Sequence, residues 1–321
     1  MNQKKLVFLF SALAFAVLCA TAGSRTCVAA KTSALHVKGT KIVNEAGKTV
    51  VLKGVSTHGI AWYPAYVNKQ CFRSFQKMGA NTVRLAFYSD DSAGYNKSLY
   101  AKVDEGVKAA TELGMYVILD WHILSDGNPK TNEGKAKEFF THFAKKYAGQ
   151  PNVLYEICNE PNGDVTWKRD IKPYAERMIR LIRKYDKKAV IIVGTPTWSQ
   201  DVDVAADDPI RNQSNIAYAL HFYAATHKEW IRDKLKAANK KGFPVIVTEY
   251  SICDASGNGA IDTKEAKAWM KLLKQYKVGR IAWNISNKNE TSALIQSSCN
   301  KTGQITKRNL SKSGKWIVKN W

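Results

Sequence analysis

Cysteine and proline are scarce in this chain of 321 residues, and no pair of cysteines has metal-ribbon spacing. Two of the six cysteines fall within the first thirty residues, and no Cys-x-x-Cys motif occurs. The other four, Cys71, Cys158, Cys253 and Cys299, are too dispersed for a disulfide-stabilised fold, although one bridge remains possible. Eight prolines and twenty glycines are too few for a collagen-like or low-complexity chain.

Acidic residues are fewer than basic ones: the chain has 27 Asp and Glu and 49 Lys and Arg, which gives a net charge of +22. A positive balance of this size favours an acidic partner or surface without identifying it. The basic residues are spread along predicted helix faces, as at 145–146, 187–188 and 240–241, and form no nucleic-acid recognition module. We therefore expect no nucleic-acid partner. The 45% of residues that are apolar are enough to form a globular core.

A long apolar run occurs only near the N-terminus. Lys4 and Lys5 precede an apolar stretch at 6–20, which is too short to span a bilayer comfortably and is followed by small residues. This order is typical of a secretory signal peptide, with possible cleavage sites at 20–22 and 28–30. An uncleaved N-terminal anchor is the alternative. We expect a secreted, extracellular protein that has no membrane attachment after cleavage.

Beyond the leader, eight short apolar runs alternate with helical patterns. The predicted strands are 51–55, 82–88, 116–122, 153–160, 190–195, 216–223, 245–250 and 280–285. Their nearly continuous apolar character indicates strands that are covered on both faces. Apolar residues at helical spacing predict helices such as 99–113, 136–147 and one opening at Pro173, whereas the link after the fifth strand has a poor pattern.

Eight strand–helix units predict a (β/α)8 TIM barrel, an α/β fold, as one catalytic domain over residues 31–321 after a signal peptide at 1–30. Two short strands within 35–50 would form an N-terminal β-hairpin that caps the bottom of the barrel. An open doubly wound sheet is disfavoured, because no Gly-x-Gly-x-x-Gly follows the first strand and no P-loop occurs.

Polar and aromatic side chains gather at the carboxyl ends of the predicted strands, where the sites of such barrels form. They are His58, Arg84, Trp121, His122, Asn159, Glu160, Trp198, His221, Tyr223, Glu249 and Trp283. Arg84 is the hardest of these to explain as a residue of the hydrophobic core, because a guanidinium inside an apolar strand keeps its charge and requires hydrogen-bond acceptors. The coincidence of these groups at one rim predicts an active site there.

Glu160 and Glu249 follow the fourth and seventh strands, which face each other across the barrel mouth. Two opposed carboxylates are what glycoside hydrolysis needs, and a separation of about 5–5.5 Å would give retention of configuration. Asn159 could bond the sugar 2-hydroxyl, and Arg84 and Tyr223 could keep Glu249 ionised. His122 and His221 could bond sugar hydroxyls. Trp62, Trp198 and Trp283 could stack on sugar rings.

The segment 157–161, Ile-Cys-Asn-Glu-Pro, resembles the Asn-Glu-Pro signature of glycoside hydrolase family 5. Further segments match family positions in the same order, and the likeness covers residues 35 to about 296. They are His58-Gly59, Asn81-Thr82-Val83-Arg84, Asp120-Trp121-His122, His221-Phe222-Tyr223, Thr248-Glu249-Tyr250 and the stretch from Trp283 to Thr291. Seven ordered motifs are a far more specific signal than Asn-Glu-Pro alone.

The resemblance implies Glu160 as general acid/base and Glu249 as nucleophile, with no metal or cofactor in the chemistry. The shell around the cleaved bond would comprise Arg84, His122, Asn159, His221 and Tyr223. Residues implied to bind glucose units are His58, Trp62, Tyr63, Trp283, Lys288 and Glu290. The similarity is strongest to secreted bacterial endo-1,4-β-glucanases. It implies a β-glucan polysaccharide as substrate, with mannan, xyloglucan or mixed-linkage glucan as near variants, and we expect a monomer.

One departure from the family pattern is visible, and two other functions compete. Tyr250-Ser251 follows the implied nucleophile where the family often has Trp-Gly, which affects the adjacent subsites. A metal-dependent barrel hydrolase could use His58, His122 and His221, but no His-x-His lies on the first strand and no strand lysine could bridge two metals. An inactive polysaccharide-binding protein is disfavoured, because both carboxylates and their supporting residues are present.

Overall fold

The described chain begins with a hairpin followed by a closed barrel. The computed structural model describes residues 32–321, so the predicted signal peptide lies outside the described residues. Strands β1 (Leu35–Lys38) and β2 (Lys41–Asn44) pair antiparallel as a separate two-stranded sheet. The barrel closes in the order β10-β3-β4-β5-β6-β7-β8-β9, with parallel neighbours throughout. The predicted (β/α)8 barrel is therefore confirmed.

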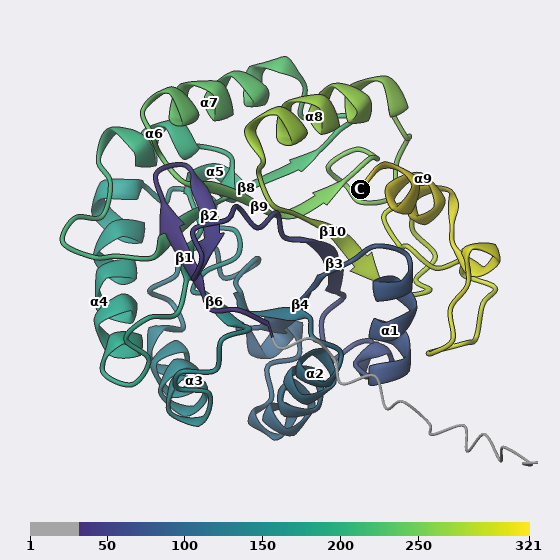
Figure 1. Ribbon diagram of the computed structural model, residues 1–321, viewed down its shortest axis with the longest axis horizontal. Helices are drawn as coiled ribbons and strands as arrows, with labels where there is room; N and C mark the ends of the chain where they lie inside the picture. The colour runs from purple at the N-terminus through teal and green to yellow at the C-terminus, as the bar shows by residue number, and fades with distance from the viewer. Residues whose placement is uncertain (1–31) are drawn as a thin grey trace, which may run out of the picture.

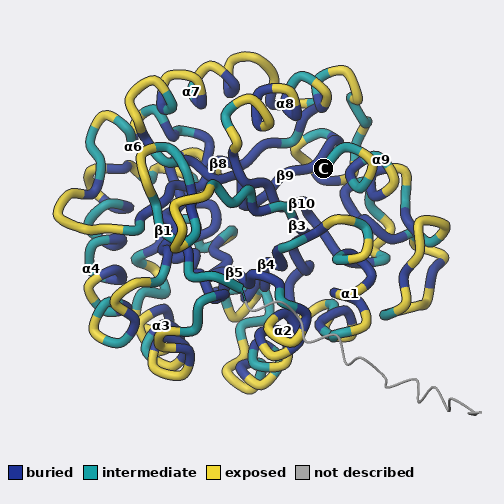
Figure 2. Tube along the Cα trace, viewed as in Figure 1, coloured by how far each residue is buried: buried dark blue, intermediate teal, exposed yellow. Residues whose placement is uncertain are grey.

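The barrel strands are short and lie close to the predicted runs. They are β3 (Lys53–Thr57), β4 (Thr82–Tyr88), β5 (Tyr116–His122), β6 (Val153–Glu156), β7 (Ile191–Val193), β8 (Ile216–Tyr223), β9 (Val245–Ser251) and β10 (Arg280–Ile285). Almost every strand residue is buried, because side chains on one face fill the barrel and those on the other face meet the helices. Figure 2 shows this as a buried centre inside a ring of partly exposed helices.

Helices form the outer ring around the strands (Figure 1). They are α1 (Lys69–Lys77), α2 (Tyr100–Glu112), α3 (Glu133–Lys146), α4 (Lys172–Arg183), α5 (Pro196–Ser199), α6 (Val202–Asp207), α7 (Glu229–Lys240), α8 (Thr263–Tyr276) and α9 (Lys312–Asn320). Single turns occur at Pro64–Tyr66, Asp91–Ala93, Lys97–Leu99, Trp167–Ile171 and Lys307–Asn309. Helix α3 shows why the pattern predicted helices, because Phe139, Phe140 and Phe143 recur on its buried face. None of the helices in the described part of the chain is long and apolar enough to cross a membrane.

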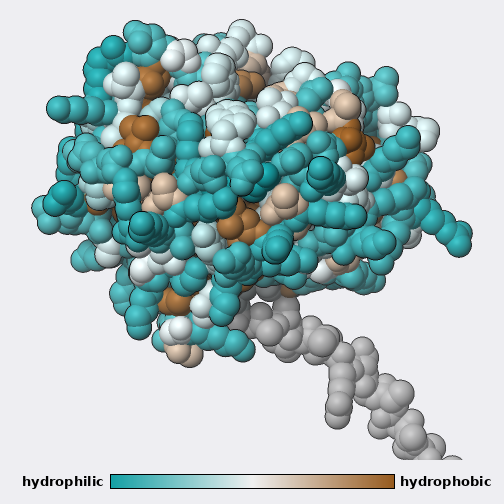
Figure 3. Space-filling view, turned by 90° about the horizontal axis from the view of Figure 1, so that it is seen from above, coloured by the Kyte–Doolittle hydropathy of each residue, from teal (hydrophilic) through white to brown (hydrophobic). Residues whose placement is uncertain are grey.

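The hairpin closes the bottom of the barrel, as predicted. Leu35 and Ile42 belong to an apolar cluster with Leu52, Leu154 and Ile246, which lie at the amino-terminal ends of strands. Apolar side chains therefore seal this end, and the opposite, carboxyl-terminal end is left for polar groups. The face shown in Figure 3 is mostly hydrophilic, with scattered apolar residues.

The structure departs from the predicted strand bounds most clearly at β6. This strand ends at Glu156 rather than at residue 160, although the Ile157 and Asn159 amides still donate to the backbone carbonyls of Ile192 and Trp121. The poorly patterned link after β7 contains the short helix α5, where Thr197, Trp198 and Ser199 all have positive φ between 55° and 57°. The possible disulfide is not formed, since all four described cysteines are free and buried.

Candidate active site

A cleft of about 700 Å³ opens at the carboxyl-terminal end of the barrel. Its lining includes ten of the predicted site residues, in accordance with the rule that barrel sites form at this end. They are His58, His122, Glu160, Trp198, His221, Tyr223, Glu249, Trp283, Lys288 and Glu290. Of the other four, Arg84 and Asn159 are buried and bonded to cleft residues. Trp62 and Tyr63 are not among the lining residues, but the Tyr63 ring lies 4.9 Å from that of His58 at the edge of the cleft.

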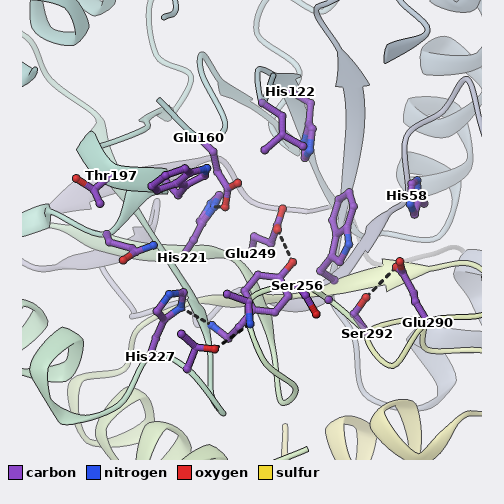
Figure 4. Close-up of a pocket in the computed structure, with 18 of the residues that line it drawn as sticks. His58, His122, Glu160, Thr197, His221, His227, Glu249, Ser256, Glu290 and Ser292 are labelled. Carbon is purple, nitrogen blue, oxygen red and sulfur yellow. Dashed lines mark hydrogen bonds and ion pairs between the residues drawn. The ribbon is translucent and has the colours of Figure 1, made fainter. Parts of the chain in front are cut away.

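Glu160 and Glu249 meet in the middle of this cleft (Figure 4). One carboxylate oxygen of each, together with a ring nitrogen of His221, lies within 4.8 Å of the others. Glu249 sits within β9, whereas Glu160 lies four residues beyond β6 on the extension that follows this strand. The barrel therefore brings together two acids that are 89 positions apart in the sequence.

Arg84 and Tyr223 hold the Glu249 carboxylate from two sides. Arg84 Nη1 donates to Glu249 Oε2 at 3.1 Å, and the Tyr223 hydroxyl donates to Oε1 at 2.8 Å. Burial, reinforced by the charge of Glu249, raises the pKa of Tyr223 well above its usual value, so the phenol keeps its proton as a donor. The two donors, one of them permanently charged, fix the orientation of the Glu249 carboxylate.

Beneath the cleft, the same guanidinium has further acidic partners. Arg84 is completely buried on β4, and its Nε donates to Glu156 Oε2 at 2.7 Å. Its Nη2 lies 3.1 Å from Asp120 Oδ2 and also donates to Asn159 Oδ1. The interior arginine singled out in the sequence thus finds the acceptors that burial requires.

Glu160 is bonded to a histidine that carries a charge. Glu160 Oε1 accepts from His221 Nδ1 at 2.9 Å, and His221 Nε2 donates to Thr248 Oγ1 at 2.9 Å. Thr248 donates in turn to Glu156 Oε1 at 2.7 Å. Burial alone would lower the pKa of His221, but the acidic partners Glu156 and Glu160 outweigh it and raise the pKa to about 9. His221 is therefore an imidazolium at neutral pH.

His122, in contrast to His221, is uncharged. Burial, assisted by the charge of Arg84, lowers the pKa of His122 to about 3, so its imidazole is neutral. Arg84 donates to Asn159 Oδ1, which makes Asn159 Nδ2 the donor that meets His122 Nε2 at 3.3 Å. His122 Nδ1 must then carry the hydrogen, and it donates to Asp120 Oδ2 at 2.7 Å. Asn159 Nδ2 also donates to the Ile123 carbonyl at 3.0 Å.

Aromatic and charged residues form the rims. Trp283 stacks on His122 at 5.2 Å between ring centroids and lies 5.3 Å from His58, and the Lys288 ammonium pairs with Glu290 at 2.7 Å. Trp62 is 58% exposed outside the cleft, where its indole N–H donates to a backbone carbonyl.

Comparison with known proteins agrees with this geometry. The sequence model of the family described as cellulase (glycosyl hydrolase family 5) matches residues 43–289. The chain belongs to glycosyl hydrolase family 5. It is therefore a glycoside hydrolase of the cellulase type.

Relatives with known names are similar over most of this chain. Endoglucanase A of Butyrivibrio fibrisolvens is 43% identical over 88% of this chain and 67% of its own length. An endoglucanase of Clostridium saccharobutylicum is 44% identical over 89% of this chain, which spans only 64% of that relative. The chain thus spans about two thirds of the length of these relatives.

Solved structures of the family share the architecture. The catalytic domain of a Thermobifida fusca endoglucanase superposes with a TM-score of 0.84 at 37% identity, covering 89% of this chain and 96% of that one. A variant of that catalytic domain in complex with cellotetraose superposes with a TM-score of 0.80 at 36% identity, covering 89% and 96% of the two chains.

The family-5 site contains residues that the sequence reasoning did not single out. Tyr88, Gln200, His227 and Trp230 line the cleft. Tyr88 is the last residue of a predicted strand, so the strand-end rule could have found it. Glu156, Thr248 and Asp120 lie beneath the cleft inside apolar strands; the chain offers no periodic signal that would pair them with Arg84.

The histidines of the alternative metal-hydrolase hypothesis do not share a ligand sphere. His58 Nδ1 accepts from the backbone of Gly59 at 2.7 Å, while His122 Nδ1 donates to Asp120. Within residues 32–321, the close group of potential ligands is Glu160, His221 and Glu249. Both nitrogens of His221 donate to protein oxygens, so this histidine has no lone pair to offer a metal ion.

Proposed function

We propose that this chain is a secreted endo-β-1,4-glucanase that cleaves internal bonds of β-glucans with retention of configuration. The observation that carries the proposal is the approach of the Glu160 and Glu249 carboxylates to within 4.8 Å in an open cleft. Retaining glycosidases separate their two carboxyl groups by about 5–5.5 Å, and inverting enzymes need roughly 6.5–9.5 Å to admit a water molecule. The close spacing supports double displacement.

In the first step, the Glu249 carboxylate attacks the anomeric carbon while Glu160 gives its proton to the departing glycosidic oxygen. Arg84 and Tyr223 donate hydrogen bonds to the Glu249 carboxylate and fix its orientation for this attack. Because His221 occupies Glu160 Oε1, the other oxygen, Oε2, can carry the proton. The bond to the leaving sugar breaks as the bond to Glu249 forms, which gives a covalent glycosyl-enzyme.

In the second step, the now ionised Glu160 takes a proton from water. The water oxygen attacks the anomeric carbon, displaces the Glu249 carboxylate and restores both acids to their starting states. Between the two steps Glu160 carries a negative charge in a nearly buried position. The imidazolium of His221, 2.9 Å away, compensates this charge.

The residues around the acids suit a sugar substrate. Asn159 Nδ2 makes its longer bond, 3.3 Å, to His122, and a sugar 2-hydroxyl could replace that contact as the transition state develops. Trp283 and Trp198 offer aromatic surface along the cleft. The relatives named endoglucanases and the matched family described as cellulase favour a glucan over mannan as the substrate.

Azide rescue tests the two roles separately. Glu249→Ala should be almost inactive, and added azide should yield an α-glycosyl azide, because the covalent step is bypassed. Glu160→Ala should lose far more activity on poor leaving groups than on good ones, and azide should yield the β-product. Glu138→Ala, an exposed glutamate paired with Lys97, is the control and should behave like the wild type. An inverted anomer from the intact enzyme would refute the retaining assignment.

A substrate panel tests the activity itself. We expect a rapid fall in the viscosity of carboxymethyl cellulose with little reducing sugar, which indicates internal cleavage. Lichenan, xyloglucan, galactomannan and xylan complete the panel, and faster turnover of any of these would reassign the substrate within the family.

Residues 1–30 are proposed to be removed on secretion, leaving 31–321 as a monomeric catalytic domain. N-terminal sequencing of protein from a culture supernatant should begin shortly after one of the two small-residue segments, at 20–22 or 28–30. Retention of Met1 in the cell fraction would favour the uncleaved anchor, and sedimentation would test the monomer.

A further inference from the structure

Three tryptophans are exposed on the surface of the described residues. Within the described residues, the large apolar side chains that are most exposed are Trp62 at 58%, Trp230 at 51%, Trp198 at 44% and Val204 at 44%. Trp198 and Trp230 both line the active-site cleft. Exposed aromatic surface along a cleft is a feature of binding sites, because indole rings offer a large apolar area that gains by being covered.

Trp230 is held in place although it is exposed. It lies in the first turn of α7, where the ring of His227 meets it edge-on at 5.9 Å. The Lys234 ammonium lies 5.3 Å from the centre of the indole and covers one of its faces. A cation–π contact on one face fixes the ring and leaves the other face for a ligand.

A polar bridge ties this ring to the segment that carries Trp198. Lys234 Nζ donates to Asp201 Oδ1, and Thr197 Oγ1 donates to Asp201 Oδ2 at 2.6 Å. Thr197 precedes Trp198 in the stretch of positive φ in α5. Asp201 thus links the lysine that covers Trp230 to the residue that precedes Trp198, so the two segments that carry these indoles are held together before a ligand binds.

The pair lies at one end of the cleft. His58 follows β3 and Glu290 follows β10, while Trp198 follows β7 and His227 follows β8, on the opposite side of the barrel order. In Figure 4 the labelled residues run from Thr197 through Glu160 and Glu249 toward His58 and Glu290. Glu160 therefore stands on the tryptophan side of Glu249. The acid protonates the departing oxygen, so the leaving part of the chain extends toward Trp198 and Trp230.

We infer that Trp230 forms, together with Trp198, a sugar-stacking platform that binds a second glucosyl unit on the leaving-group side of the cleaved bond. This inference rests on the proposed function. The ligand is a β-linked gluco-oligosaccharide with at least two units beyond that bond. The platform favours internal cleavage, because a chain end with a single unit on that side gains nothing from Trp230.

The test compares a long substrate with one that cannot reach Trp230. Cellopentaose spans both tryptophans, whereas 4-nitrophenyl β-cellobioside places only a small aryl group on the leaving side. For Trp230→Ala, the ratio of kcat/KM on cellopentaose to that on the chromogenic substrate should fall about 3- to 10-fold, the loss of one aromatic stacking contact. Cleavage positions on reducing-end-labelled cellopentaose should move toward bonds with fewer units on the leaving side.

Two further variants make the result specific. Trp230→Phe keeps an aromatic face and should retain most of the ratio, which guards against a folding defect in Trp230→Ala. Val204→Ala changes an equally exposed apolar residue outside the cleft and should leave the ratio unchanged. An unchanged ratio and cleavage pattern in Trp230→Ala would overturn the platform while the proposed function stands. Absence of turnover of both substrates by the wild type would overturn the proposed function, and the platform with it.

Discussion

The contacts of His221 with its acidic neighbours Glu156 and Glu160 make the stability of this protein depend on pH in a defined way. His221 donates to Glu160 and to Thr248, and its pKa is about 9 in the folded protein against about 6.5 for an unfolded chain. A raised pKa means that the folded state binds the proton more tightly. Its contribution, on the order of 3 kcal/mol, is fully present below pH 6.5 and is lost as the pH rises through 9.

Thr248→Val removes the hydroxyl that accepts from the imidazolium and donates to Glu156, with little change in volume. His221 Nε2 would be left 3.7 Å from Glu156 Oε1, too far for a good hydrogen bond. At pH 6 we expect a loss of about 2–3 kcal/mol, the range for a buried hydrogen bond to a charged group. At pH 10 His221 is neutral in both proteins, so roughly 1 kcal/mol should remain for the lost bond to Glu156.

Denaturant unfolding at unit steps from pH 6 to pH 10 measures both quantities. The control is Thr195→Val, another fully buried threonine, whose hydroxyl donates to the Ala219 carbonyl at 3.1 Å. Since no titrating group is its partner, its free-energy cost should not vary with pH. A difference between wild type and Thr248→Val that stayed constant from pH 6 to pH 10 would refute the assignment of His221 as a buried cation.

Other consequences of the structure can be checked by standard measurements. Arg84→Met leaves buried carboxylates without their cation, so calorimetry should show a loss of about 3–5 kcal/mol, roughly 5–8 °C in melting temperature. Gly54→Ala would place its Cβ 2.0 Å from the Thr82 carbonyl oxygen, so little soluble protein should form. On helix α3, the Cβ added by Gly134→Ala would have no atom within 4 Å. Because alanine restricts the unfolded chain more than glycine does, this substitution should add about 0.4–1 kcal/mol to the free energy of unfolding. Hydrolysis should survive EDTA, because both nitrogens of His221 are already donors; loss restored by a divalent ion would contradict this.

The barrel could be predicted from the sequence because its strands are covered on both faces. Such strands read as short apolar runs, and the predicted 82–88, 116–122 and 216–223 coincide with β4, β5 and β8. Strand β6 was predicted too long. The run from Val153 to Glu160 stays largely apolar, but β6 itself ends at Glu156, and the next residues keep only single backbone bonds to Ile192 and Trp121. Because these residues are buried like the strand before them, the sequence gives no signal of where the strand ends.

The site was predictable to the extent that its residues stand at strand ends. Glu160 and Glu249 could be assigned to the site because they lie at strand ends. Arg84 could be assigned because it is a charged residue within an apolar strand. Glu156 and Thr248 occupy the same kind of position as Arg84, but pairing them required the register of the closed barrel and the inward or outward direction of each side chain. Trp230 lies on a helix, where an aromatic residue reads equally well as core or as rim.

The different cations beside the two acids explain how one pair of glutamates can serve two roles. Glu249 contacts Arg84, which holds its charge at any pH that the fold survives. Glu160 contacts His221, whose charge depends on both of its acidic neighbours. When Glu160 loses its proton to the leaving group, the imidazolium gains a stronger partner at the moment the new charge forms.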